Sequence, residues 1–248
     1  MKTLYFNCPM GAAGDMLMGA LFELCPDPAA YLHAFEQLNL PGVHLTAESA
    51  VSHGQAGTHM RLTVHGHEEL EHDHHSHHHH HHNTPLDIAH IISHLPVSDW
   101  VKDNARAVYD RIADAESKAH GVPVSQVHFH EVGALDAVGD VVGCCMLLEM
   151  IAPDVIFASP IALGQGTLTC AHGELPVPAP ATANILEGLP SYMGPVDGEL
   201  CTPTGAALLA HFVSEFRECP GFAQSKTGCG LGTKDFGRPN CVCAVLGE

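Results

Sequence analysis

The sequence predicts an α/β protein: a mixed sheet with flanking helices and a long His-rich loop insertion. Strand-like runs alternate with amphipathic, helix-like runs along the 248 residues, which is the pattern of α/β folds. Segments 42–51 and 57–66 alternate apolar and polar residues as antiparallel strands do. Hydrophobic residues make up 46% of the chain, and no apolar run approaches the roughly 20 residues that a membrane-spanning helix needs. We therefore expect a real core and no membrane association.

The first part of the chain predicts a strand, a helix and a hairpin. Residues 2–8 (KTLYFNC) have the pattern of a short strand, and an amphipathic helix begins near Asp15. The turn PMGAAGD lies between them. The two alternating segments then form the antiparallel pair.

A run of nine histidines follows between residues 72 and 82, inside an acidic loop at 68–83. Near pH 7 imidazoles are mostly neutral, and their free nitrogen lone pairs bind Zn, Ni, Cu and Co. The predicted metal ligands are His72, His74, His75, His77, His78, His79, His80, His81 and His82. The alternative is a solvated low-complexity loop with incidental metal affinity.

The rest of the chain continues the alternation of helices and strands. The expected elements are helices at 85–95 and 99–121, a strand-like start leading into an apolar helix over 127–151, a strand within 154–164, and a last strand before residue 248. Gly121 is the expected C-cap of the second helix. We divide the chain into a strand–helix–hairpin region at 1–67, the flexible His-rich loop at 68–83 and an α/β main region at 84–248, although the first and last regions could form one continuous domain.

Charge and cysteine usage narrow the class of protein. Ten Lys and Arg against 28 Asp and Glu give a formal net charge of −18, which argues against nucleic-acid binding, because such binding needs basic side chains to neutralise phosphates. The start of the chain lacks the pattern of a signal peptide, so we expect a cytoplasmic protein. The ten cysteines contain no C-x-x-C pair, and buried free thiols are the default interpretation for most of them.

The densest group of chemically active residues lies in VHFHEVGALDAVGD. His128 and His130 are two residues apart, so on a strand both imidazoles project to one face. Glu131 follows, and Asp136 and Asp140 are spaced i,i+4 on the helix that begins after the turn. These side chains could hold a divalent cation or act as acid and base. The alternative is a hydrogen-bonded structural corner.

Cys170 and His172 form a second candidate pair, again two residues apart. A thiolate and an imidazole suit nickel or zinc, and the imidazole could also take a proton from a substrate. Rigid packing of a proline-rich loop is the alternative.

The turn before the first helix is a candidate phosphate site. Exposed N–H groups at a helix N-terminus attract anions, so a phosphate could dock between Gly11 and Gly14. Asp15 would repel that phosphate unless a cation bridged the two groups. The alternative is that Asp15 is an N-cap.

A glycine-rich run near the end of the chain is a further phosphate candidate. The backbone at Gly228, Gly230 and Gly232 could approach a phosphate, and Lys234 could neutralise it. The run does not match the G-x-x-x-x-G-K-[ST] pattern, so no P-loop nucleotide site is visible.

Five blocks, in order and spacing, resemble the LarC-type nickel-insertion family, and the resemblance covers nearly the whole chain. They are CPMGAAGDML, VHFHEVGALDAVGDVVG, ASPIALGQGTLTCAHGELPVPAPAT, ELCTPTGAALL and GCGLGTKDFGRPNC. The resemblance implies insertion of Ni²⁺, as substrate, into pyridinium-3,5-bisthiocarboxylic acid mononucleotide. The product would be the nickel-pincer nucleotide cofactor of lactate racemase-type enzymes.

The same resemblance implies a CTP-dependent cyclometallase, in the lyase class. His128, His130, Glu131, Asp136 and His172 become candidate bases or transfer ligands, and the histidine run concentrates nickel. We expect CTP and Mg²⁺ to be used by a C-terminal companion portion, because relatives continue past residue 248. A homo-oligomer is compatible with the sequence.

The chain departs from the family pattern at Asn7–Met10, where many relatives carry an acidic residue and a Phe-Ser pair. It also has Cys229 and Cys243 where relatives often carry Tyr and Arg. Two other functions stay open: a nickel storage or delivery protein without catalysis, and an unrelated hydrolase that uses His128 and Asp136.

Overall fold

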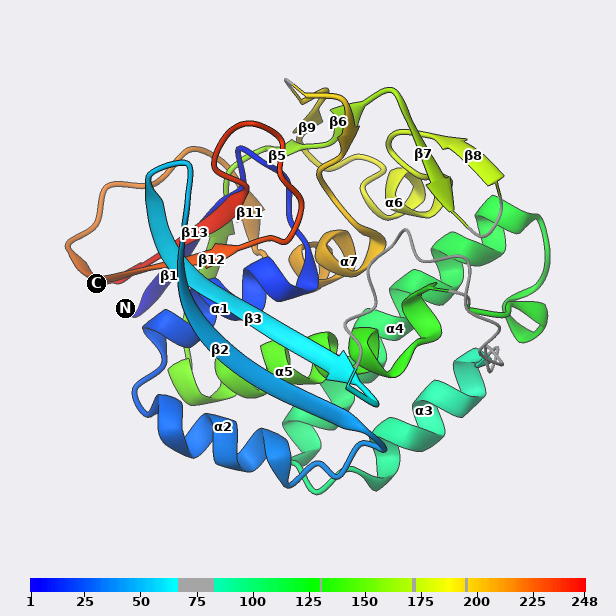
Figure 1. The fold of residues 1–248 in the computed structure, drawn as a ribbon, viewed down its shortest axis with the longest axis horizontal. Helices are drawn as coiled ribbons and strands as arrows, with labels where there is room; N and C mark the ends of the chain where they lie inside the picture. Colours follow the sequence, from blue (N-terminus) through cyan, green and yellow to red (C-terminus); the bar gives the residue numbers. More distant parts are fainter. Residues whose placement is uncertain (67–82, 130, 171–172, 195) are drawn as a thin grey trace.

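A seven-stranded mixed sheet is the centre of the structure, a computed structural model that describes residues 1–66, 83–129, 131–170, 173–194 and 196–248 (Figure 1). Its strands are β1 (Thr3–Asn7), β2 (Val43–Ser52), β3 (Gln55–Val64), β4 (Val155–Ala158), β11 (Glu215–Phe216), β12 (Gln224–Leu231) and β13 (Cys241–Gly247). Their order across the sheet is β11-β4-β1-β13-β12-β3-β2. The predicted α/β class is confirmed, and the His-rich loop lies outside the described residues.

The helices and the smaller strands complete the fold. The helices are α1 (Gly14–Leu24), α2 (Pro28–Glu36), α3 (Pro85–His94), α4 (Asp99–His120), α5 (Leu135–Ile151), α6 (Pro180–Ile185) and α7 (Pro203–Phe212), with 3₁₀ turns η1 (Val124–Gln126) and η2 (Glu131–Gly133). Small two-stranded sheets pair β5 (Ile161–Ala162) with β9 (Ser191–Tyr192), β6 (Gly164–Gln165) with β10 (Gly198–Glu199), and β7 (Thr167–Cys170) with β8 (Gly173–Pro176). Among the helices that the structure describes, none combines the length and apolar character needed to cross a bilayer.

The sheet mixes parallel and antiparallel pairs. β1 runs parallel to β4 and antiparallel to β13, so both ends of the chain lie in the middle of the sheet. The predicted hairpin is confirmed as β2 and β3. β3 joins β12 through a parallel contact of Thr58 with Gly230. The first 66 residues and the last strands therefore share one sheet, while the proposed division into regions stays a prediction.

Helix α1 lies directly on strand β12, and glycine makes this contact possible. A Cβ atom added to Gly230 would lie 1.8 Å from the carbonyl oxygen of Met16, and one on Gly228 would lie 2.4 Å from that of Ala20. Both distances are far below van der Waals contact. The glycines of this run thus have a packing role, because only a strand without side chains on this face lets the helix backbone approach so closely.

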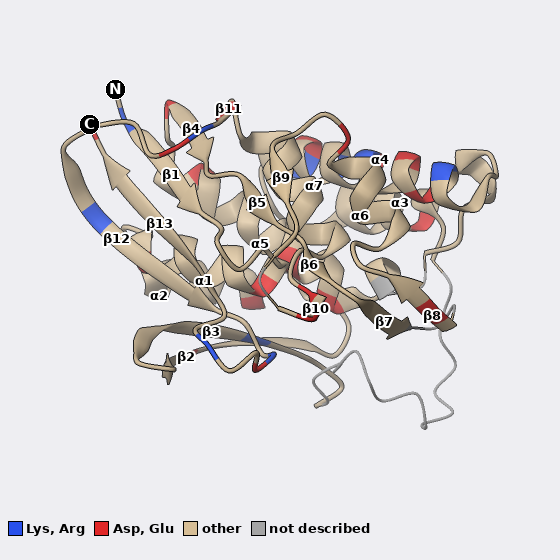
Figure 2. Ribbon diagram, turned by 90° about the horizontal axis from the view of Figure 1, so that it is seen from above, with Lys and Arg blue, Asp and Glu red and all other residues tan. Residues whose placement is uncertain are grey.

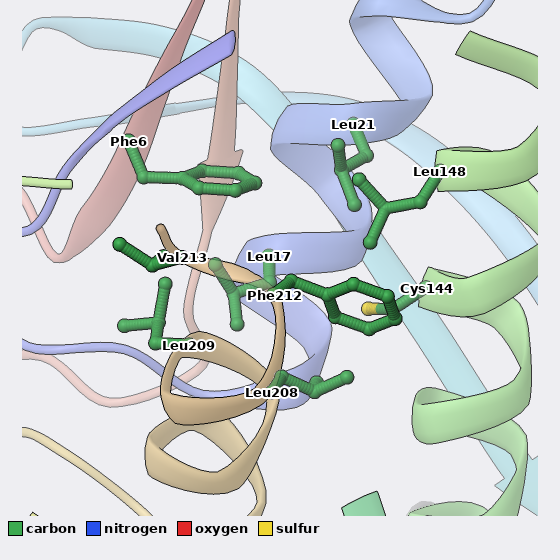
Figure 3. A pocket seen from close by; sticks show the side chains of 9 residues that line it. All are labelled: Phe6, Leu17, Leu21, Cys144, Leu148, Leu208, Leu209, Phe212 and Val213. Carbon is green, nitrogen blue, oxygen red and sulfur yellow. The ribbon is translucent and has the colours of Figure 1, made fainter. Parts of the chain in front are cut away.

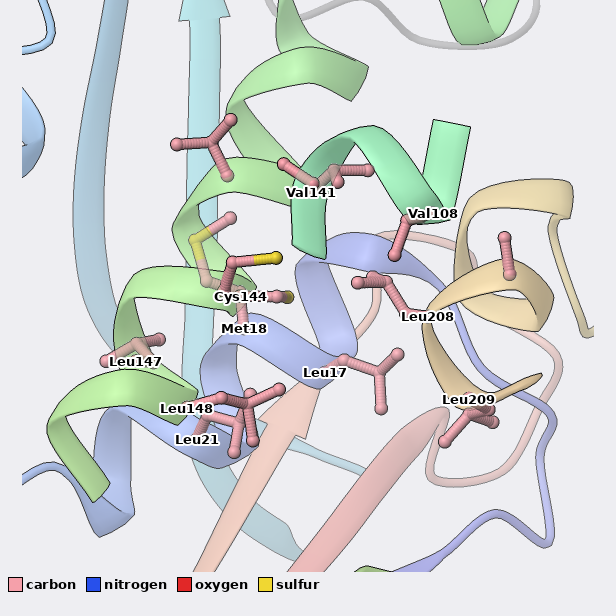
Figure 4. Close-up of a cluster of buried hydrophobic side chains, with 14 of the residues drawn as sticks. Leu17, Met18, Leu21, Val108, Val141, Cys144, Leu147, Leu148, Leu208 and Leu209 are labelled. Carbon is pink, nitrogen blue, oxygen red and sulfur yellow. The ribbon is translucent and has the colours of Figure 1, made fainter. Parts of the chain in front are cut away.

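The core lies between α1, α5 and α7 and the sheet. Leu17 and Leu21 of α1 pack between α5 residues such as Leu148 and α7 residues such as Leu208 (Figure 4). The gap left there measures about 10 Å³, the space of about one water molecule. It is lined by Phe6, Leu17, Leu21, Cys144, Leu148, Leu208, Leu209, Phe212 and Val213 (Figure 3). This apolar gap is too small for a ligand. Helix α1 is therefore packed closely against α5 and α7 on this side, and against β12 on the other.

We predict that Gly230→Ala lowers the free energy of unfolding by at least about 2 kcal/mol, because the added methyl group must push α1 away from β12. Urea unfolding monitored by circular dichroism measures the change. Gly221→Ala is the matched control, because a Cβ atom there has nothing within 4 Å. It should change the free energy by less than about 1 kcal/mol. Equal effects of the two substitutions would contradict the packing argument.

Candidate metal and substrate site

Segments that are distant in sequence meet around the turn between β1 and α1. The backbone N–H of Cys8 donates to the hydroxyl of Ser159 at 2.9 Å. The N–H of Thr202 donates to the carbonyl oxygen of Ala12 at 3.0 Å. Three of the sequence blocks that suggested the family therefore lie side by side, and the start of α1 is held in the middle of them.

Three carboxylates come together where α1 meets α5. Asp15 is in the first turn of α1, and Asp136 is in the first turn of α5, with Asp140 one turn later. A Cβ atom on Gly14 would lie 2.3 Å from a carboxylate oxygen of Asp140, so this carboxyl group points inward against the start of α1. Figure 2 shows acidic segments of the ribbon near α5. The N-cap alternative for Asp15 is wrong, because Ala13 is the N-cap.

The pKa of Asp140 is affected by this crowding of carboxylates. Burial of its carboxyl group raises the pKa of Asp140 well above the usual value, and the negative charges of Asp15 and Asp136 raise it further. Like charges in a buried place disfavour ionisation unless a cation compensates them. The raised pKa suits Asp140 to holding a proton. The carboxylate oxygens of the three residues are not among the described ligand atoms that all lie within 4.8 Å of one another, so rotation of the side chains would have to bring them around a shared divalent cation.

Weakly acidic groups surround the same place. Burial, followed by the charge of Asp140, raises the pKa of the Cys144 thiol, and burial with the charges of Asp136 and Asp140 raises the pKa of Tyr109. The buried hydroxyl of Tyr31 has no hydrogen-bond partner among the described residues. These groups stay protonated at neutral pH, so they add polar contacts but no charge.

The HFHE corner differs from the expected strand. Phe129 forms a single bridge with Asn83, and residues 131–133 form the 3₁₀ turn η2. Phe129 is buried, whereas His128 is exposed beside it. The buried phenyl ring and the short turn replace a regular strand here. Glu131 lies in η2, and His130 lies outside the described residues, so the joint geometry of the two histidines stays a prediction.

The segment that follows the histidine run is attached to this corner. The N–H of Phe129 donates to the carbonyl oxygen of Asn83 at 2.9 Å, and the side-chain amide of Asn83 donates to the carbonyl oxygen of Gly133 at 2.7 Å. The nine predicted metal ligands at 72–82 lie outside the described residues. Asn83, which follows them in sequence, is held by these hydrogen bonds beside the predicted catalytic corner.

Two further histidines near this corner were not identified from the sequence. His90 and His94 are exposed, one turn apart on α3, with ring centroids 4.3 Å from each other. Hydrogen bonds from Thr84 lower the pKa of Asp87, and the charges of His90 and His128 lower it further, so His128 lies near the start of α3. The i,i+4 spacing that joins His90 and His94 is visible in the sequence and could have signalled the pair.

The second predicted pair is only partly described. Cys170 ends β7 and Gly173 begins β8, and the two strands are antiparallel. His172 lies outside the described residues, between these two strands in sequence. Its pairing with Cys170 stays a prediction.

The predicted phosphate contacts have structural roles of their own. Gly11 has a φ of +73° and lies against the carbonyl oxygen of Leu200, and Gly14 lies against Asp140. Gly228 and Gly230 face α1, as described above. An anion at Gly11–Gly14 would meet the carboxylate of Asp140, so it would need a bridging cation. The phosphate contacts stay predictions.

Gly232 lines an open cavity of about 300 Å³. The lining residues are Ala50, Val51, Ser52, His59, Arg61, Leu231, Gly232 and Thr233. Arg61 pairs with Glu48 at 3.4 Å, and Lys234 follows the lining residues in sequence. Gly232 also packs against Met16, the neighbour of Asp15. His59 and Arg61 alternate on β3 with the buried residues of the core face, so the cavity opens on the other face of the sheet. Its volume is at the lower end of the range for small-molecule sites.

Comparisons with known proteins identify the family to which the chain is similar. Residues 4–248 match the family described as "Nickel insertion protein". The chain is 40% identical to the pyridinium-3,5-bisthiocarboxylic acid mononucleotide nickel insertion protein of Clostridium kluyveri and 38% identical to the protein of the same name from Desulfitobacterium hafniense. Both alignments cover 100% of this chain but only 62% and 59% of those proteins. No solved structure matches the chain.

We predict that Asp140→Asn stabilises the protein at neutral pH when a chelator removes metal ions. The folded-state pKa of Asp140 is above the unfolded value of about 3.9, so the folded state binds the proton more tightly. The free energy of unfolding therefore decreases as pH rises from the unfolded pKa through the folded one, and stays low above it. Asparagine has no carboxyl group to ionise, so the free energy of unfolding of the variant should not decrease in this way as pH rises.

Urea unfolding of the wild type and the variant at acidic and neutral pH measures the effect. The gain should be present at neutral pH and absent at acidic pH, and added Ni²⁺ should stabilise the wild type more than the variant. Asp110→Asn, at an exposed position on α4, should show neither effect. A neutral-pH stability of Asp140→Asn below that of the wild type would contradict the argument.

Proposed function

The chain belongs to the nickel insertion protein family, and on this premise we propose that it inserts nickel into pyridinium-3,5-bisthiocarboxylic acid mononucleotide. The names of the two relatives support this substrate. The product would be the nickel-pincer nucleotide cofactor of lactate racemase-type enzymes. The observation that carries the proposal is the family match over residues 4–248. This range includes Asp15, Asp136 and Asp140, the three carboxylates where α1 meets α5, which we call the acidic junction.

The chemistry sets three requirements for the protein. Ni²⁺ must arrive largely free of competing ligands, so that the two thiocarboxylate sulfurs can bind it. A Ni–C bond then forms at the pyridinium ring as the C–H bond breaks, and its proton passes to a base. The nucleotide phosphate must be held so that the ring faces the metal.

The acidic junction suits the first two requirements. In our proposal Asp15, Asp136 and Asp140 hold Ni²⁺ through oxygen, a weaker ligand for this metal than the substrate's sulfur. Transfer from oxygen to sulfur is then favourable. A carboxyl group with a raised pKa, as at Asp140, is also better suited to accept the proton than an ordinary one.

The HFHE corner supplies further candidate bases and transfer ligands. We propose that His128, His130, Glu131 and His172 act together with Asp136 in these roles. The histidine run would collect Ni²⁺ and deliver it to the corner, and the bonds of Asn83 to Phe129 and Gly133 support this route. His90 and His94 form an exposed pair of imidazoles near this corner that could bind Ni²⁺ during its transfer.

For the phosphate we propose the open cavity beside Gly232. Arg61 lines this cavity, Lys234 lies close by in sequence, and a mononucleotide phosphate needs such cations. Gly11 and Gly14 remain a second proposed contact, with nickel or another cation bridging the phosphate and Asp140.

We further propose that the reaction is CTP-dependent, with Mg²⁺, and that CTP is used by a C-terminal companion portion. The chain spans about three fifths of the length of the two relatives, and its sequence contains no P-loop pattern. A cytoplasmic location and a homo-oligomer remain proposals from the sequence.

The direct test is nickel transfer into the thiolated pyridinium nucleotide, followed by mass spectrometry. We predict that the purified chain with the nucleotide substrate, Ni²⁺, CTP and Mg²⁺ forms no nickel cofactor and consumes no CTP. Adding the C-terminal portion of a relative to the same mixture should give both. Full turnover by the chain alone would place CTP use within these residues, and no product under any condition would contradict the proposed function.

Residues of the fixed corner should matter more than any single histidine of the redundant run. We predict that His128→Ala and Glu131→Gln each lower product formation at least about tenfold, as expected for loss of a general base or a metal ligand. His79→Ala, assayed at the same saturating nickel concentration, is the matched control and should stay near wild-type activity. If all three variants keep that activity, the corner is structural.

A further inference from the structure

Three cysteines share one face of the pair of strands β12 and β13. Cys229 lies directly opposite Cys243, and Cys241 is two residues from Cys243 on the same strand. Gly228 and Gly230, which alternate with Cys229, face α1. Because successive strand residues point to opposite faces, the three thiols lie on the face of the sheet away from α1 and Asp15.

The sulfur atoms are close enough to share one ion. The Sγ atoms of Cys229 and Cys243 are 2.9 Å apart, and all three sulfurs lie within 4.8 Å of one another. The three are free thiols. Cys229 and Cys241 are buried, whereas Cys243 is half-buried, so the group can be reached from solvent on one side.

These distances fit thiolate coordination after small adjustments. A Zn–S bond of about 2.3 Å places the sulfurs of a tetrahedral site about 3.8 Å apart. The Cys229–Cys243 separation would have to open by about 1 Å, which rotation of the side chains can supply. Three protein ligands would leave a fourth position for water or an external ligand on the side of Cys243.

The charge state of the group also favours a cation. Hydrogen bonds from the thiols of Cys229 and Cys241 lower the pKa of Cys243 to about 3. The same contact raises the pKa of Cys229. Metals bind the thiolate form of cysteine, and the sulfur positions bring three potential thiolate ligands around one point.

We propose that Cys229, Cys241 and Cys243 form a three-thiolate site for a thiophilic metal ion such as Zn²⁺, Ni²⁺ or Cu⁺. The site is separate from the acidic junction, because it lies on the opposite face of β12, and the proposal does not depend on the proposed function. Packing of three thiols as small apolar groups is the competing explanation.

The test is a titration of the full chain with Co²⁺, under reducing and anaerobic conditions, followed by absorption spectroscopy. Only thiolate ligands give sulfur-to-cobalt charge-transfer bands in the near ultraviolet, so imidazoles of the histidine run do not contribute. Because the imidazoles also take up cobalt, we expect the bands to saturate at the intensity of a single thiolate-bound cobalt ion per chain, whatever the total amount of cobalt bound. Ni²⁺, Zn²⁺ and Cu⁺ are then added in separate arms, and the ion that displaces cobalt most effectively is the preferred occupant.

Cys243→Ser and Cys241→Ser should each abolish or strongly reduce the bands. Cys219→Ser is the matched control, because Cys219 is an exposed free thiol outside the group, and it should keep them. Absence of the bands in the wild-type chain would overturn the proposal without any variant. Full bands in Cys243→Ser would overturn it as well.

Discussion

The backbone of helix α1 lies directly against strand β12, and this close contact determines where α1 and its neighbours can lie. A side chain at Gly228 or Gly230 would collide with carbonyl groups of the helix, so only glycine fits at these two positions. On its other side α1 is packed against α5 and α7 with almost no free space. The helix therefore has one position, and so does its N-terminus.

That position brings Asp15 to the carboxylates of α5. An isolated buried carboxylate is costly, and several near one another are more so. The raised pKa of Asp140 reflects this cost, and a divalent cation would offset it. A protein that must hold nickel only until sulfur ligands take it benefits from such a site, because oxygen ligands bind this metal with moderate strength. The acidic junction and the nickel-insertion family thus support one interpretation.

Local features of the fold could be predicted from the sequence, while distant contacts could not. Alternation predicted the hairpin of β2 and β3, and Gly121 was correctly identified as a C-cap, with a φ of +64°. A glycine run looks the same in sequence whether a ligand or a helix approaches it, so the packing of Gly228 and Gly230 against α1 could not be predicted, and the phosphate contacts stay a prediction. The approach of the start of α1 to Asp140 joins segments far apart in sequence, so it depends on tertiary packing alone. The thiol group was missed for the same reason, since the pairing of Cys229 with Cys243 depends on strand register.

Anomalous diffraction at the nickel absorption edge can show whether the acidic junction binds nickel. Crystals of the chain without residues 72–82, grown or soaked with Ni²⁺, would show where the metal binds when the histidine run cannot compete. We expect a nickel peak within bonding distance of carboxylate oxygens of Asp15, Asp136 or Asp140. Nickel found only at other places, with these three carboxylates free of metal, would contradict it.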